Sequence, residues 1–175
     1  MSQSEQAVTA TANALKCELA SDVLRSSGTL RLQVMGWSMV PTLWPGDRLL
    51  IDQVDHSLIS AGDIILFGRD QRLFAHRVVS DTRNVGTGMC TMTRGDGMST
   101  TDPPVPPSEV LGRVSLVLRG GQWMKPAAKL GLKKSALANM VRHSVWAARI
   151  LVRLHGLRAI PLRETQQEQG IPCQS

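Results

Sequence analysis

The sequence has no tyrosine, two phenylalanines, four tryptophans and three cysteines in 175 residues. The cysteines, Cys17, Cys90 and Cys173, are odd in number and far apart, which argues against a disulfide framework and against a paired-cysteine metal or redox motif. The four histidines are separated from one another and from the cysteines, so no segment has zinc-ligand spacing. We therefore predict no metal, no cofactor and a reducing compartment.

Long apolar runs are also missing. Charged side chains interrupt the first thirty residues, so they contain no apolar core of a secretory signal. No later stretch reaches the 18 or so uncharged apolar residues of a membrane-spanning helix. These absences predict a cytoplasmic or peripherally membrane-associated protein. The content of 42% hydrophobic and 19% charged residues is that of an ordinary folded chain.

Acidic residues are absent between Arg119 and Arg163, where ten of the 20 Lys and Arg residues lie. The rest of the chain carries ten basic against 14 acidic residues, a net charge of −4, so the overall charge of +6 comes from the C-terminal part. Such asymmetry is typical of a protein that meets an anionic partner, although a solvated basic tail gives the same pattern. The lack of a helix-turn-helix pattern and of stacking aromatics argues against nucleic acid.

A helix is predicted over residues 5–26, because Val8, Leu15, Leu19 and Val23 recur at roughly helical spacing and Gly28 is placed as a stop signal. We expect this helix to pack on the following domain. From Thr29 the period changes to two, which predicts a half-buried strand. Further strands are expected at 47–54, 63–68, 72–80, 89–94 and 109–118, separated by glycine-rich turns. Residues 102–109 contain four prolines and are expected to be an extended loop.

Short strands at this spacing predict a mainly β fold, a coiled antiparallel sheet or partial barrel, with flanking N- and C-terminal helices. We expect three parts: an N-terminal helix packed on the core at 1–28, a β domain at 29–119, and a basic amphipathic helix and tail at 120–175. The C-terminal helix is expected at 135–155, with Arg142, Arg149 and Arg153 on one side and apolar residues on the other.

Ser38 and His76 are the first candidates for chemistry. A serine is a nucleophile only when a base removes its proton and donors stabilise the oxyanion that follows. Ser38 follows a predicted strand, where a turn would expose its hydroxyl. On local sequence alone, a turn serine and a half-buried strand histidine beside Phe74 are the more common outcomes.

Four short boxes follow one another between Gly36 and Arg113 and reverse that judgement. They are Gly36-Trp37-Ser38-Met39-Val40-Pro41-Thr42-Leu43 with Pro45-Gly46-Asp47; Ala61-Gly62-Asp63-Ile64-Ile65-Leu66-Phe67; Ala75-His76-Arg77-Val78-Val79; and Thr93-Arg94-Gly95-Asp96 with Asp102 and Val110-Leu111-Gly112-Arg113-Val114. Together they resemble the superfamily of signal peptidase I and the SOS-repressor peptidases. The resemblance implies the fold of that type and a serine endopeptidase.

Within that superfamily, archaeal and endoplasmic-reticulum signal peptidases use histidine as the general base, where others use lysine. The resemblance therefore implies Ser38 as nucleophile, His76 as base and Asp102 as the acid that orients it. Histidine suits this role because an imidazole in water has a pKa of about 6.5 and is mostly neutral at pH 7. Asp96 shares the acid role or orients its loop, and the sequence leaves this open. Arg77 should point to the opposite face of the strand and form a structural ion pair.

Three features need separate predictions. Signal peptidases often carry a serine two residues before the nucleophile, and Gly36 stands there, so the second oxyanion donor is undefined. Trp37 either shapes the substrate cleft or is buried in the core. Asp47 and Asp63 are expected to form turns after glycine.

The resemblance implies a peptide substrate bound as an extended strand, with small residues at the scissile position. The A-x-A pattern within residues 8–14 fits self-cleavage, but an alanine-rich helix is the better interpretation. In place of a membrane anchor, the helix at 135–155 could lie on an anionic membrane surface; docking on the protein itself or on a partner is equally consistent. The function predicted is cleavage of a leader or signal segment. The alternative is a catalytically inactive binding module, recruited by the C-terminal helix.

Overall fold

The computed structural model describes residues 3–85 and 88–128. The strands are β1 (Thr29–Gln33), β2 (Arg48–Asp52), β3 (Ile64–Arg69), β4 (Arg72–Val85), β5 (Gly88–Arg94), β6 (Val110–Arg119) and β7 (Gln122–Met124). The helices are α1 (Gln3–Ser27) and two 3-10 turns, η1 (His56–Leu58) and η2 (Pro107–Glu109). The amphipathic helix predicted at 135–155 lies outside the described residues. None of the described helices is long and apolar enough to span a membrane.

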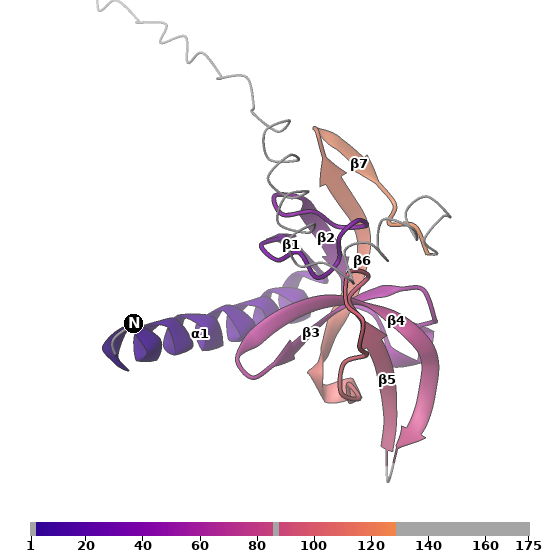
Figure 1. Ribbon diagram of the computed structural model, residues 1–175, viewed down its shortest axis with the longest axis horizontal. Helices are drawn as coiled ribbons and strands as arrows, with labels where there is room; N and C mark the ends of the chain where they lie inside the picture. Colours follow the sequence, from indigo (N-terminus) through magenta and orange to yellow (C-terminus); the bar gives the residue numbers. More distant parts are fainter. Residues whose placement is uncertain (1–2, 86–87, 129–175) are drawn as a thin grey trace, which may run out of the picture.

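The strands form one antiparallel sheet in the order β1-β2-β6-β3-β4-β5, and β7 pairs with the end of β6 (Figure 1). The sheet is not closed, because β1 and β5 lie at its two ends. The prediction of a mainly β, antiparallel fold with an N-terminal helix is confirmed. Strand β7 was not predicted, since three residues are too few to show an alternating pattern.

Helix α1 extends away from the sheet, with its N-terminal end farthest from the strands (Figure 1). Its C-terminal half packs against the sheet through Ala20 and Leu24, which are buried. The leucines whose spacing predicted the helix do not make this contact, because Leu15 and Leu19 are each 54% exposed. A small residue at position 20, one turn before Leu24, allows the helix to approach the sheet closely.

Two clusters of buried side chains make up the core. The larger one joins Leu24 of α1 to residues of β2, β3 and β6, and it includes Met39 and Leu43 from the loop between β1 and β2. The smaller one contains Phe67, Val78 and Val105. Burying Met39 and Leu43 fixes the β1–β2 loop against the sheet, which brings Ser38 from the β1 end of the sheet to β4.

Candidate functional site

The Ser38 turn begins four residues after β1 ends. The backbone N–H groups of Val40 and Thr42 donate to the carbonyls of Trp37 and Met39 at 3.0 and 2.8 Å. Val40 and Leu43 are fully buried, whereas Ser38 is only half-buried. The segment is therefore a rigid turn that exposes one side of the Ser38 side chain and anchors the residues after it.

The His76 side chain lies in the middle of β4 and is buried. Its Nε2 atom lies 2.9 Å from the Ser38 Oγ atom. Its ring packs against two aromatic rings, with centroid distances of 6.0 Å to Phe67 and 5.9 Å to Phe74. Phe67 and Phe74 are cross-strand neighbours on β3 and β4, so the hairpin itself builds a platform for the imidazole.

Asp102 binds the His76 nitrogen that faces away from Ser38. Its Oδ2 atom lies 2.7 Å from His76 Nδ1 and accepts a hydrogen bond from the Thr93 hydroxyl at 2.7 Å. The Asp102 N–H also donates to the Thr93 carbonyl at 2.8 Å. Thr93 is fully buried at the end of β5, so it holds both the backbone and the carboxylate of Asp102 in place.

The pKa of Asp102 lies below its usual range. Burial on its own raises this pKa, but the hydrogen bonds from His76 and Thr93 and the electrostatic influence of His76 and Arg69 together outweigh burial. The carboxylate is consequently ionised at neutral pH. An ionised carboxylate accepts a hydrogen bond from a protonated Nδ1, and in the neutral imidazole this leaves Nε2 as the acceptor that faces Ser38.

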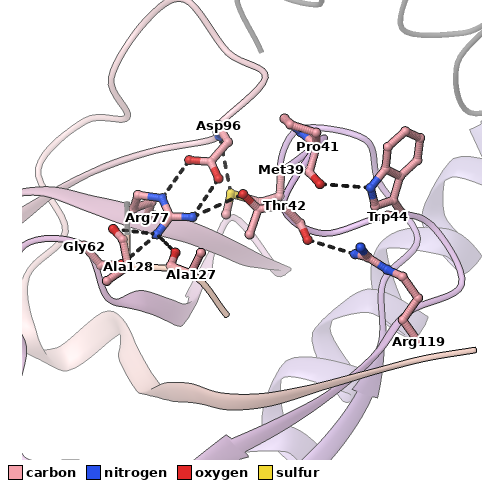
Figure 2. A network of polar contacts seen from close by, with 10 residues as sticks. All are labelled: Met39, Pro41, Thr42, Trp44, Gly62, Arg77, Asp96, Arg119, Ala127 and Ala128. Atoms are coloured by element: carbon pink, nitrogen blue, oxygen red, sulfur yellow. Dashed lines mark hydrogen bonds and ion pairs between the residues drawn. The ribbon is translucent and has the colours of Figure 1, made fainter. Parts of the chain in front are cut away.

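Asp96 lies on the other side of β4, where it binds Arg77 (Figure 2). The two Asp96 oxygens accept from Nε and one terminal nitrogen of Arg77, both at 2.8 Å, and both side chains are buried. The other terminal nitrogen donates to the carbonyls of Gly62, Ala127 and Ala128. The structural role predicted for Arg77 agrees with this network, and Asp102 rather than Asp96 is the partner of His76 Nδ1.

The turn after β5 touches the main chain of Ser38. The N–H of Gly97 donates to the Ser38 carbonyl at 2.8 Å, and a Cβ atom on Gly95 would lie 2.6 Å from that same oxygen. A side chain at position 95 would therefore collide with the backbone of Ser38. Asp96 lies between Gly95 and Gly97, so its ion pair with Arg77 holds the turn that contacts the Ser38 backbone.

Gly36 lies in open space, since no atom of the described residues beyond its two chain neighbours lies within 4 Å of the position of a Cβ atom there. Trp37 is 38% exposed, which excludes burial in the core. Among the described residues, no acceptor binds the backbone N–H groups of Trp37, Ser38 and Met39. These three N–H groups are therefore donors without an acceptor in the described part of the chain.

Asp47 and Asp63 both lie in turns, as predicted. Asp47 accepts from the Trp44 N–H at 2.8 Å and pairs with Arg119, and Asp63 accepts from the Ser60 N–H at 3.0 Å. Sequence reasoning missed Thr93 as a partner of Asp102, although Thr93 opens the Gly95-Asp96 box. Within 3–85 and 88–128, no group of three or more His, Cys, Asp or Glu side chains could hold a metal ion.

The arrangement provides a hydroxyl, a base in contact with it, and a carboxylate on the far side of the base. Such a row can transfer the Ser38 proton to His76 and stabilise the imidazolium that results. No protein-family model and no curated protein matches the chain.

Proposed function

We propose that the protein is a serine endopeptidase of the signal-peptidase type, with Ser38 as nucleophile, His76 as general base and Asp102 as orienting acid. The observation that carries the proposal is the unbroken row of contacts from Ser38 Oγ to His76 to Asp102, at 2.9 and 2.7 Å. In this proposal the sheet has the fold of the signal peptidases and SOS-repressor peptidases, which the four sequence boxes resemble.

In the proposed reaction, His76 Nε2 carries the proton in each step. His76 Nε2 accepts the Ser38 proton as Oγ attacks the scissile carbonyl, and the imidazolium then protonates the leaving amine. Asp102 stays ionised and fixes the tautomer that leaves Nε2 unprotonated. The same nitrogen then takes a proton from a water molecule as its oxygen attacks the acyl-enzyme, and it returns that proton to Ser38 Oγ as the ester bond breaks and the acid product leaves.

The oxyanion in this mechanism forms beside the Ser38 turn. The Ser38 N–H is the first donor, because it is attached to the nucleophile and meets no acceptor within the described residues. The second donor is a neighbouring N–H of the same turn, since Gly36 offers no hydroxyl. A catalytic rate below that of a peptidase with a serine at this position follows from the weaker set of donors.

The substrate in this proposal is a leader or signal segment that binds as an extended strand. Helix 135–155, which lies outside the described residues, is proposed to bring the enzyme to an anionic membrane surface. The alternative, a catalytically inactive binding module, predicts the same fold without turnover. The two functions are separated by an assay of peptide-bond cleavage.

The experiment is incubation of the full chain with a signal-peptide substrate that contains an A-x-A site, presented in anionic vesicles. We expect the wild type to cleave the peptide, and Ser38→Ala and His76→Ala to have no activity above background. Ser115→Ala is the matched control, because the Ser115 hydroxyl donates to the Leu50 carbonyl on β2 and makes no hydrogen bond to His76 among the described residues. Equal cleavage by the wild type and Ser38→Ala would contradict the proposal, and no cleavage by either protein would favour the binding module.

A further inference from the structure

The loop that carries Asp102 is held partly by hydrogen bonds from another strand. Pro103 and Pro104 have no N–H groups, so the loop cannot form the turn hydrogen bonds that usually fix a short connection. Its backbone is held at one end by Asp102 and at the other by Val105, which pairs with Thr91 at 2.8 and 2.9 Å. The carbonyl groups of Pro103 and Pro104, two exposed residues between these points, accept hydrogen bonds from another part of the molecule.

Arg69, the last residue of β3, supplies those donors. Its two terminal nitrogens donate to the carbonyls of Pro103 and Pro104 at 3.0 and 2.8 Å. Its Nε atom donates to Glu109, in η2, at 2.8 Å. One guanidinium group therefore ties the start and the end of the 102–109 segment to the strand that neighbours His76.

Arg69 also contacts the platform beneath the imidazole. Its guanidinium carbon lies 5.7 Å from the centroid of Phe67, the ring that packs edge-on against His76. Burial raises the pKa of Asp102, and the charge of Arg69, together with the partners His76 and Thr93, lowers it. Arg69 thus contacts both the loop that carries Asp102 and the Phe67 ring that packs against His76.

We propose that Arg69 is a positioning residue, which holds the Asp102 loop so that the carboxylate meets His76 Nδ1. This inference rests on the proposed function for its effect on rate, but its effect on the His76–Asp102 hydrogen bond is independent of catalysis. The fork of a guanidinium matches two adjacent carbonyls, which a single ammonium group cannot do. We therefore expect lysine to replace Arg69 only in part.

Arg72 provides a matched control. It is the cross-strand partner of Arg69 in the same hairpin, and its guanidinium carbon lies at the same distance, 5.7 Å, from the Phe74 ring. It carries the same charge and makes no hydrogen bond to the 102–104 loop within the described residues. A difference between Arg69→Met and Arg72→Met therefore reports the contacts to the loop.

The test combines two readouts on the full chain. The first is the second-order rate constant for labelling of Ser38 by a fluorophosphonate probe, which needs no known substrate. We expect Arg69→Met to lower this constant about 10²-fold, as a displaced catalytic group does. Arg69→Lys should lower it about tenfold, and Arg72→Met should match the wild type. The second readout is the His76 Nδ1–H resonance in proton NMR, which a hydrogen bond to a carboxylate shifts downfield and protects from exchange.

The outcomes separate this inference from the proposed function. If the wild type is labelled and Arg69→Met is labelled equally fast with an unchanged Nδ1–H resonance, the positioning role is overturned and the peptidase proposal stands. If the wild type is not labelled, but Arg69→Met alone loses the resonance, the peptidase proposal fails and the positioning role stands. If Arg69→Met does not fold, Arg69→Lys and Glu109→Gln carry the test, and a wild-type rate and resonance in both would overturn it.

Discussion

His76 and Arg77 are adjacent in β4, point to opposite faces of the sheet, and each binds an aspartate. On the His76 face, the Asp102 side chain is 22% exposed and the imidazole also contacts the Ser38 hydroxyl. On the Arg77 face, the Asp96 side chain is 3% exposed and the cation also binds three carbonyl groups. One face carries a group that can gain and lose a proton, and the other a permanent charge.

Residues on both faces of β4 are linked to Ser38. The His76 face contacts the Ser38 hydroxyl, and the Arg77 face supports the Gly95–Gly97 turn that binds the Ser38 carbonyl. This comparison assigns different effects to mutations on the two sides. Changes on the His76 face should alter rate with little effect on stability, and changes on the Arg77 face should alter stability first.

The largest expected effect is on rate, from His76→Gln, which keeps most of the side-chain volume. Loss of the base should reduce fluorophosphonate labelling about 10⁶-fold, as removal of the histidine does in serine peptidases. The free energy of unfolding in urea should change by no more than about 1–2 kcal/mol, the usual range for a single substitution. A large loss of stability with the rate preserved would break the comparison.

Asp102→Asn should have the next largest effect. An amide in place of the carboxylate favours the wrong tautomer of His76, and the labelling rate should fall about 10⁴-fold. Asp96→Asn serves as the matched control, and it should lose stability before it loses rate. A larger rate loss in Asp96→Asn than in Asp102→Asn would reverse the roles of the two acids.

Arg77→Met tests the second face. Removing the cation leaves the Asp96 carboxylate buried and unpaired, which should lower the free energy of unfolding by about 3–5 kcal/mol. The double variant Arg77→Met with Asp96→Asn should recover part of that loss, because the uncompensated charge is gone. Chemical denaturation of the three proteins measures the difference, and an unchanged free energy in Arg77→Met would show that the pair does not support the fold.

A smaller effect is expected in the pH dependence of stability. Because the pKa of Asp102 is lowered on folding, its ionised form stabilises the protein fully above the unfolded pKa of about 3.9 and loses this effect as pH falls through the lower folded value. The difference in free energy of unfolding between wild type and Asp102→Asn should therefore shrink between pH 5 and pH 2. A difference that stays constant over that range would mean that the Asp102 pKa is not lowered.

The smallest effect concerns the oxyanion. Gly36→Ser places a hydroxyl two residues before the nucleophile, in space that is open around an added Cβ atom. We expect the labelling rate to rise by about three- to tenfold, less than the full worth of a preorganised donor. Gly36→Ala is the control, since it adds the Cβ atom without the hydroxyl. An equal rise in both variants would attribute the gain to backbone rigidity.

The sequence predicts the strands and the chemical residues better than it predicts their partners. Alternation along the strands identified six of the seven, and the four boxes pointed to Ser38, His76 and Asp102 together. It could not rank Asp96 against Asp102, because that choice depends on how the loop after β5 returns to pair with Thr91 and Thr93. The period of two along β4 did place His76 and Arg77 on opposite faces.

Two other results had no usable signal in the sequence. Helix α1 contains two apolar stripes, one through Leu15 and Leu19 and one through Ala20 and Leu24, and periodicity alone does not say which one meets the sheet. Arg69 binds main-chain carbonyl groups of a loop more than thirty residues away, and carbonyl groups are the same in every sequence. Contacts of this kind become visible only in three dimensions.

The central claim is that Ser38 is an activated nucleophile. It is tested most directly by treating the folded protein with a fluorophosphonate probe and locating the adduct by peptide mass mapping. The account predicts one adduct per chain, on Ser38, formed in the wild type and in Ser115→Ala and absent from Ser38→Ala and His76→Gln. An unlabelled wild type, or an adduct on Ser38 that forms equally fast without His76, would contradict it.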